Sequence, residues 1–394
     1  MNILYIHSDR ITLDDMRWGL YQLGIEADLY PQKVTMHESM EGIDIKEEEE
    51  ALKKFMQQKE YAAVITYDFN IIVAIVCKEL KVKYISWIFD SPNIALYSDI
   101  AKSEYNYVFV FDKAQYNRMK KEGLLHLYHL PLAANVDRTS GLIISEEDEE
   151  KYRHEIVFVG SLYQENGFNE KKDMLTQESR EKICQIIQKT ALHWGKEYRC
   201  FDVLEDEAVS EIYRELHSEV RGLYIDKKYM LELFLFGRKI TEIDRIHILN
   251  TLAAEHDVTL YTGSDTSNLR NVKKRGRVDY WEKLPKIFYL SKINLNITMR
   301  SIETGIPQRV FDIMGVGGFV LSNYQEEMAE LFVPDREIVL FKDVPELIDK
   351  VDYYLAHEEE RIRIAMNGYK KVRERYSTQE AVGKMLKIVL DASI

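Results

Sequence analysis

The stretch 292–323, KINLNITMRSIETGIPQRVFDIMGVGGFVLSN, decides most of what the sequence says about the fold and about function. It predicts a short buried strand at 293–297, a polar loop, one short helix and a second strand at 318–322. We expect Pro307 in the first helical turn, where its missing N–H costs nothing, and Gly317 and Gly318 at the helix end. A strand, a loop and a helix N-terminus in this order are typical of an anion site, because unpaired backbone N–H groups point toward the loop.

Arg309 lies in the first turn of that helix. The helix dipole disfavours a cation there by roughly 0.3–1 kcal/mol, which indicates a negative group nearby. Asp312 shares the helix face of Arg309 three residues later. The two side chains could instead form a surface ion pair, worth only about 0.2–0.5 kcal/mol. Both interpretations stay open at this point.

The composition is that of a globular protein with sizeable cores. The chain has 394 residues, 46% of them hydrophobic and 30% charged, which predicts two or three domains. A formal net charge of −13 argues against nucleic acid as the main partner. Three cysteines, Cys77, Cys184 and Cys200, have no metal-like spacing. With no secretory segment and no apolar run long enough to span a membrane, we expect a cytoplasmic protein.

Residues 1–134 alternate short apolar runs with amphipathic stretches. The expected strands are 3–7, 26–30, 63–67, 83–88, 107–111 and 126–130, and the expected helices are 13–23, 47–58, 71–80 and 113–121. This alternation predicts a parallel sheet with helices on both faces, and its ligand site lies beyond the carboxyl ends of the strands. Those ends carry His7, Ser8, Tyr67, Asp68 and Asp90. Each of these residues could touch a substrate, or could simply cap a turn or a strand end.

A second alternation follows a charged connection at 135–151. It begins with a strand at 155–159, is interrupted by a helical stretch at about 171–244, and resumes with a strand at 258–261. A last helix is expected to start at Ser377 or Thr378. Two doubly wound α/β halves with a cleft between them are the economical interpretation.

Several catalytic and phosphate-binding motifs are missing. The sequence contains no GxxxxGK[ST], HExxH, CxxC or GxSxG motif, and no Asp-x-Asp triplet that could hold a metal–diphosphate. A bound diphosphate would have to be neutralised by helix ends, backbone N–H groups and Arg or Lys. The stretch around Arg309 offers that set, and Gly160 and Ser161 at a strand end offer a second backbone cradle.

A family resemblance enters with these residues. The run 288–355, with LSKINLNITMRSIETGIPQRVFDIMGVGGFVLSNY followed by ELF, EIVLF and VPELIDKVDYYL, resembles the C-terminal domain of CgeB-like (spore-maturation-type) glycosyltransferases. KITEIDRIHILNTLAAEHDVTLYTG is similar to the segment that precedes it in that family. ISWIFDSPN is similar to the N-terminal domain that accompanies it.

The resemblance implies a GT-B architecture, with two Rossmann-like domains facing a cleft. Residues 1–134 would form the acceptor-side domain, 135–151 a linker, and 152–377 the nucleotide-sugar-binding domain with the helical insert. We expect the C-terminal helix, 378–394, to pack back on the first domain.

The family also carries two acidic residues in its second domain. Asp312 matches the acid that binds the ribose, and Glu303 is the nearest candidate for the acid that faces the sugar. Glu303 lies nine residues before Asp312, one more than in many retaining GT-B enzymes, and Thr304, Gly305 and Ile306 replace the usual Gly-Phe-Gly.

The resulting hypothesis is metal-independent transfer of a sugar from a nucleoside diphosphate sugar, with a UDP-sugar as the expected donor and no cofactor. Retention of configuration follows only by analogy. The expected catalytic residues are Arg309, Glu303, His7 and Asp90. The expected donor-binding residues are Gly160, Ser161, Tyr261, Gly263, Thr304, Gly305, Ile306, Gln308, Arg309 and Asp312, and the expected acceptor-side residues are Ser8, Asp68 and Asp90.

Three other functions remain compatible with the sequence. A nucleotide-sugar epimerase or phosphorylase would share the fold without this acceptor, and a catalytically silent protein would bind the nucleotide-sugar without turnover. An interaction scaffold would use the helical insert to bind partners, although its aromatic residues fit a buried core equally well. The acceptor, whether a glycan, a protein or a small molecule, is not indicated by any motif.

Overall fold

The computed structural model describes residues 2–7, 13–34, 45–195, 206–215 and 224–391. The chain divides into two compact units. The first contains residues 1–135, 220–224 and 375–394, and the second contains residues 136–219 and 225–374. Cys200 and Ser8 lie outside the described residues. No helix in the described ranges is both long enough and apolar enough to cross a bilayer.

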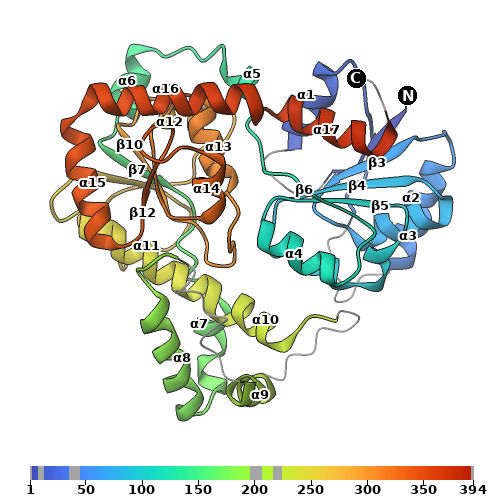
Figure 1. Cartoon of the computed structure of the whole chain (residues 1–394), viewed down its shortest axis with the longest axis horizontal. Helices are drawn as coiled ribbons and strands as arrows, with labels where there is room; N and C mark the ends of the chain where they lie inside the picture. Colours follow the sequence, from blue (N-terminus) through green and yellow to red (C-terminus); the bar gives the residue numbers. More distant parts are fainter. Residues whose placement is uncertain (1, 8–12, 35–44, 196–205, 216–223, 392–394) are drawn as a thin grey trace. The chain divides into compact units, whose positions relative to one another are not determined.

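The first unit is a parallel sheet flanked by helices (Figure 1). Its strands are β1 (Ile3–Tyr5), β2 (Asp28–Leu29), β3 (Ala63–Tyr67), β4 (Lys83–Ile88), β5 (Asn106–Val110) and β6 (His126–His129). Its helices are α1 (Leu13–Gln22), α2 (Ile45–Met56), α3 (Ile71–Leu80), α4 (Lys113–Lys121) and α17 (Thr378–Leu390), with 3₁₀ turns η2 (Ile94–Tyr97) and η3 (Asp99–Lys102). The strand order is β2-β1-β3-β4-β5-β6, so the direction of winding reverses between β1 and β3.

The second unit contains another six-stranded parallel sheet. Its strands are β7 (Ile156–Val159), β8 (Val258–Tyr261), β9 (Lys273–Arg275), β10 (Ile293–Asn296), β11 (Val320–Asn323) and β12 (Val339–Phe341). Its helices outside the insert are α5 (Val136–Thr139), α6 (Glu146–Tyr152), α11 (Arg238–Leu252), α12 (Lys283–Leu290), α13 (Gln308–Gly315), α14 (Glu326–Leu331), α15 (Val344–Ala356) and α16 (Glu358–Arg375). The order β12-β11-β10-β7-β8-β9 is that of a Rossmann sheet. The predicted fold class, two Rossmann-like parallel sheets, is therefore confirmed.

Helices cover both faces of the second sheet because its strands are apolar on both faces. On one face, Phe158 and Leu260 pack with Leu249 of α11 and Leu347 of α15. On the other face, Val157 and Tyr261 pack with residues of α6 and α12, including Ile287. Figure 1 shows α12 and α11 on different sides of this sheet. The charged segment before β7 contains the helix α6. Lys286 of α12 donates to Asp148 of α6 at 2.7 Å, which joins the two helices on this face.

In the described residues, the regular elements of the predicted insert are helices, joined by short non-helical segments such as 191–195. The insert contains α7 (Gly167–Lys171), η4 (Lys172–Met174), α8 (Gln177–Thr190), α9 (Asp206–Glu215), α10 (Lys227–Leu231) and the π-helix η7 (Glu232–Gly237) that leads into α11. Its apolar side chains form a core of their own, with Ile183, Ile212 and Leu235 fully buried. Much of its apolar surface is thus used internally, which leaves less of it for a partner.

The C-terminal helix α17 lies beside α1 in the first unit (Figure 1). Ser377 caps α17, since its hydroxyl accepts from the N–H of Glu380. The two helices approach closely at Gly19 of α1, where a Cβ would lie 3.0 Å from Val382 and 3.2 Å from Thr378. Gly383 of α17 is different, because a Cβ there would meet Leu23 at an ordinary 3.8 Å.

We therefore expect Gly19→Leu to lower the free energy of unfolding by about 1–3 kcal/mol, the usual effect of forcing extra volume into a packed interface. Gly383→Ala is the control and should be neutral or slightly stabilising, because alanine favours helix. Urea unfolding of both variants measures the difference. Equal stability of Gly19→Leu and the wild type would contradict the packing described.

Candidate functional site

The second sheet places its ligand site where its winding reverses. The chain passes from β7 outward through β8 to β9, returns to β10 beside β7, and then continues outward through β11 to β12. In open α/β sheets, ligands bind beyond the carboxyl ends of the strands at such a reversal. A ligand is therefore expected beside the residues that follow β7 and β10.

Arg309, on the first turn of α13, reaches across these two strand ends. Its Nη1 donates to Oδ1 of Asn296, the last residue of β10, at 2.8 Å. Its guanidinium carbon lies 5.0 Å from the ring centre of Phe158 in β7. The residue after β7 is Gly160, where a Cβ would lie only 2.6 Å from Nη2 of Arg309. A glycine is thus needed at 160 for Arg309 to lie in this position.

A second arginine, Arg245 of α11, lies beneath the same strand ends and is only 2% exposed. It donates to the carbonyl of Ser161 at 2.6 Å and twice to the carbonyl of Ile297, at 2.5 and 3.2 Å. These carbonyls belong to the loops after β7 and β10. The guanidinium carbon of Arg245 lies 5.1 Å from the ring centre of Phe158. Arg245 therefore ties together the two loops that flank the reversal.

Neither guanidinium is neutralised by an ion pair with a carboxylate in the described residues. Asp244, next to Arg245, is fully buried and pairs with Arg300 at 2.6 Å. Asp312 accepts from Tyr280 at 3.1 Å and from Gln308 at 2.8 Å, rather than from Arg309. The alternative of an Arg309–Asp312 surface pair is thus not what the structure shows.

The two arginines instead leave excess positive charge at this edge of the sheet. Burial, and then the nearby charge of Arg245, lower the pKa of the Arg309 guanidinium below its usual value. Burial also lowers the pKa of Arg245. Both groups keep their charge at neutral pH, because a guanidinium is not deprotonated in proteins. An anion at this position would therefore be stabilised by both.

The N-terminus of α13 adds backbone donors to this charge. Pro307 is the N-cap residue, with φ −69° and ψ 152°, and no side chain caps the first turn. The expectation that Pro307 lies inside the first turn was therefore off by one position, because its extended ψ places it just before the helix. The N–H of Val310 donates to the carbonyl of Pro307 at 3.0 Å. The positive end of the helix dipole still suits an anion at this N-terminus.

Two hydrogen bonds attach the loop before α13 to residues 325–327. The hydroxyl of Thr304 donates to Glu327 at 2.8 Å, and the amide of Gln325 donates to the carbonyl of Ile302 at 2.8 Å. Thr304, Gly305 and Ile306 are buried, and Glu303 and Gln308 are half-buried. The predicted donor-binding side chain of Thr304 thus holds the loop in place, whereas the predicted roles of Glu303 and Gln308 stay predictions.

The residues after β8 lie at the same edge of the sheet as the residues after β7. The hydroxyl of Ser264 accepts from the N–H of Leu162 at 2.9 Å and lies 3.2 Å from the hydroxyl of Ser161. Gly263 is exposed at this edge. Tyr261, predicted to border the donor, is only 8% exposed and its hydroxyl lies 2.9 Å from Nε2 of His154. Its side chain belongs to the core between β8 and α6, because it lies on the face of the strand that α6 and α12 cover.

The predicted acceptor-side residues lie in the first unit and differ in exposure. Asp68 is fully buried, and its Oδ1 accepts from the N–H groups of Phe89 and Asp90 at 2.9 and 3.0 Å. This geometry favours the capping interpretation of Asp68 over contact with an acceptor. Asp90 is half-buried, His7 is exposed, and Ser8 lies outside the described residues.

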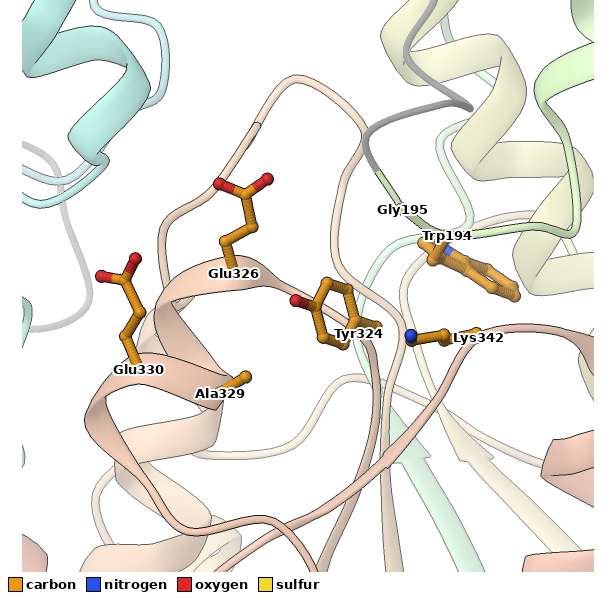
Figure 2. Close-up of a pocket in the computed structure, with 7 residues that line it drawn as sticks. All are labelled: Trp194, Gly195, Tyr324, Glu326, Ala329, Glu330 and Lys342. Atoms are coloured by element: carbon orange, nitrogen blue, oxygen red, sulfur yellow. The ribbon is translucent and has the colours of Figure 1, made fainter.

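A pocket of about 440 Å³ lies farther along the second sheet, past β11 and β12 (Figure 2). It is lined by Trp194, Gly195, Tyr324, Glu326, Ala329, Glu330 and Lys342. Lys342 Nζ lies 4.9 Å from the ring centre of Tyr324, and Figure 2 shows Glu326 and Glu330 projecting from α14. No predicted site residue lines this pocket, so it is distinct from the arginine pair.

Three site residues escaped the sequence analysis: Arg245, Asn296 and Phe158. In the sequence, Arg245 belongs to a helical pattern in which a cation is usually exposed, so nothing there indicates its burial. Asn296 did carry a signal, since a polar residue at the end of a buried strand is unusual unless it is hydrogen-bonded. In the described residues, no group of three or more His, Cys, Asp or Glu side chains is placed to hold a metal ion.

Known proteins share this fold. Residues 243–387, less than half of the chain, match a family model described as glycosyl transferase-like. No curated protein sequence matches the chain. The CgeB-like resemblance therefore stays a prediction within this broader family match.

Solved structures match nearly the whole chain at low sequence identity. Sucrose-phosphate synthase from Thermosynechococcus elongatus is 9% identical, with a TM-score of 0.60 over 99% of this chain and 98% of that chain. Anabaena HepE in complex with UDP and glucose is 10% identical, with a TM-score of 0.55 over 100% of both chains. T4 phage BGT in complex with its UDP-glucose substrate is 11% identical, with a TM-score of 0.51 over 100% of both. The chain thus has the GT-B fold of these glycosyltransferase structures.

We expect Arg245→Met to lower the free energy of unfolding by about 2 kcal/mol or more, because the carbonyls of Ser161 and Ile297 lose their buried donors. Arg245→Lys should lose less, since an ammonium can still donate to one of them. Arg363→Ala breaks only an exposed ion pair with Glu360 and serves as the control. If denaturant unfolding finds Arg245→Met as stable as this control, Arg245 does not tie the two loops together.

Proposed function

We propose that the chain is a glycosyltransferase that moves a sugar from a nucleoside diphosphate sugar, with a UDP-sugar as the expected donor, to an acceptor hydroxyl. The observation that carries the proposal is the charge at the strand reversal. Arg309 and Arg245 share the ring of Phe158, and neither pairs with a carboxylate in the described residues. The family match over residues 243–387 and the UDP-bound neighbours support the same donor class.

Arg309 would act on the leaving group. As the bond between the anomeric carbon and the diphosphate breaks, negative charge grows on the departing oxygen. The Arg309 guanidinium and the N–H groups of α13 stabilise that charge more strongly than they stabilise the bound donor. The acceptor oxygen forms the new bond to the anomeric carbon, and the products are the glycosylated acceptor, the nucleoside diphosphate and the proton that the acceptor hydroxyl releases. Because Arg309 already lies over Gly160, little reorganisation is needed at that moment.

Asp312 would hold the ribose. Tyr280 and Gln308 both donate to Oδ1 of Asp312, and these two bonds fix the orientation of the carboxylate. An ionised carboxylate only accepts hydrogen bonds, and ribose hydroxyls can donate to it. The position of Asp312 on the second turn of α13, past Arg309, suits a nucleoside attached to a diphosphate at the first turn.

The proposal includes catalysis without a bound metal ion. Two guanidinium groups and a helix N-terminus supply the positive charge that a divalent cation supplies elsewhere. Within this proposal, Glu303 faces the transferred sugar, and His7 and Asp90 face the acceptor. The acceptor class and the stereochemical outcome are left open, as is the cellular compartment.

Arg309→Ala should weaken UDP binding by roughly 10- to 100-fold, because hydrogen bonds to charged groups contribute about 1.5–3 kcal/mol. Gly160→Ala should weaken binding in the same direction, because the new methyl group would occupy the place of the Arg309 guanidinium. Titration calorimetry with UDP measures both. Arg373→Ala, which removes an exposed charge from α16, is the control. Wild-type affinity in Arg309→Ala would remove the diphosphate role.

Asp312→Ala should reduce the preference for UDP over 2′-deoxy-UDP and 3′-deoxy-UDP. The wild type is expected to bind UDP several-fold more tightly than either analogue, since a hydrogen bond to a carboxylate is lost in each. The affinities of the variant for the three nucleotides should converge. An unchanged preference in the variant would remove the ribose assignment of Asp312.

Transfer is separated from the alternative activities by incubation with a UDP-sugar alone and then with candidate acceptors. A transferase consumes the donor substantially faster when a suitable acceptor is present. Conversion of the donor sugar without an acceptor indicates an epimerase. Binding without turnover under every condition indicates a silent binding protein.

A further inference from the structure

A second arginine-covered glycine lies beside the first. Arg277, two residues after β9, crosses the α-carbon of Gly263, which is two residues after β8. A Cβ on Gly263 would lie 2.3 Å from Nε of Arg277 and 3.0 Å from its Cγ. The stem of Arg277 therefore lies flat on Gly263, as the end of the Arg309 side chain lies on Gly160. At both glycines, the side chain of any larger residue would occupy the place where the arginine now lies.

The two glycines form one continuous floor. β7 and β8 are hydrogen-bonded neighbours, with Val159 opposite Tyr261, and adjacent strands lie about 4.8 Å apart. The loops after these strands are also joined, because Ser264 accepts from the N–H of Leu162 and contacts Ser161. Gly160 and Gly263 thus follow adjacent strands at one edge of the sheet. A nucleoside diphosphate that lies along this edge with its diphosphate over Gly160 would place its nucleoside over Gly263.

The chain after Arg277 leads to the residue proposed to bind the ribose. Tyr280, three residues on, donates to Asp312 at 3.1 Å. The segment 277–280 therefore borders both the Gly263 floor and the ribose position. The guanidinium of Arg277 is exposed and forms no hydrogen bond or ion pair with the described residues, so its donors remain available for a ligand.

We propose that Arg277, lying on Gly263, is the residue that selects the nucleobase of the donor. It favours uracil and guanine, which carry a carbonyl oxygen at position 4 or 6, over cytosine and adenine, which carry an amino group there. The proposal rests on the proposed function of the neighbouring arginine pair. A guanidinium only donates hydrogen bonds. Guanine offers the O6 and N7 acceptors and uracil offers carbonyl oxygens, whereas adenine and cytosine place an amino donor at the corresponding edge.

The test measures binding of UDP, GDP, ADP, CDP and pyrophosphate to the full-length wild type and to three variants by titration calorimetry. The wild type should bind UDP or GDP at least tenfold more tightly than ADP and CDP. Arg277→Ala should remove most of this preference and leave pyrophosphate affinity unchanged. Gly263→Ala should reproduce Arg277→Ala, because its methyl group takes the place of the Arg277 stem. Arg275→Ala, which removes an exposed charge two residues away, should keep the wild-type preference.

The outcomes separate this inference from the proposed function. Wild-type nucleotide ratios in Arg277→Ala overturn the base-selecting role and leave the diphosphate site intact. An equal loss for every ligand, pyrophosphate included, also overturns it, because Arg277 would then act only as a charge. A wild type that binds neither nucleotides nor pyrophosphate overturns both proposals. If Gly263→Ala fails to fold, Arg277→Ala alone decides, since an exposed side chain can be removed without disturbing the core.

Discussion

The buried guanidinium of Arg245 is the constraint on which the proposed site depends. It joins the carbonyls of Ser161 and Ile297, and so fixes the loops after β7 and β10 relative to each other. A buried cation without a carboxylate is costly, and here carbonyl oxygens and the ring of Phe158 compensate for part of that cost. Burial, and then the charge of Arg245, also lower the pKa of the neighbouring Arg309. An anion bound at this edge would offset the repulsion between the two guanidinium groups.

The fold was accessible from the sequence because its strands are short, apolar runs separated by helices of regular period. β3, β4 and β8 begin and end where the pattern predicts. β9 was missed, since Lys273–Arg275 are all exposed and an edge strand of charged residues has no apolar alternation. The pairing with β8, which makes these basic residues a strand, is a tertiary effect.

The site was predicted only in outline. Arg309, Gly160 and Ser161 were found because a glycine at a strand end and a cation at a helix start are local signals. The hydrogen-bond partner of Arg309, Asn296, could not be found that way, because it lies on β10, a different element. The like charge of Arg245 comes from yet another element, α11. Tyr261 and Asp68 were placed toward ligands because they end strands, yet both side chains are taken up inside their own units by His154 and by the N–H groups of residues 89 and 90.

The central claim is that a diphosphate binds over Gly160, against Arg309 and the first turn of α13. A crystal structure of the full chain with bound UDP tests this most directly. The account predicts diphosphate oxygens within hydrogen-bonding distance of the Arg309 guanidinium and of the first N–H groups of α13. Diphosphate density in the pocket lined by Tyr324 and Lys342 (Figure 2), with Arg309 untouched, would contradict it.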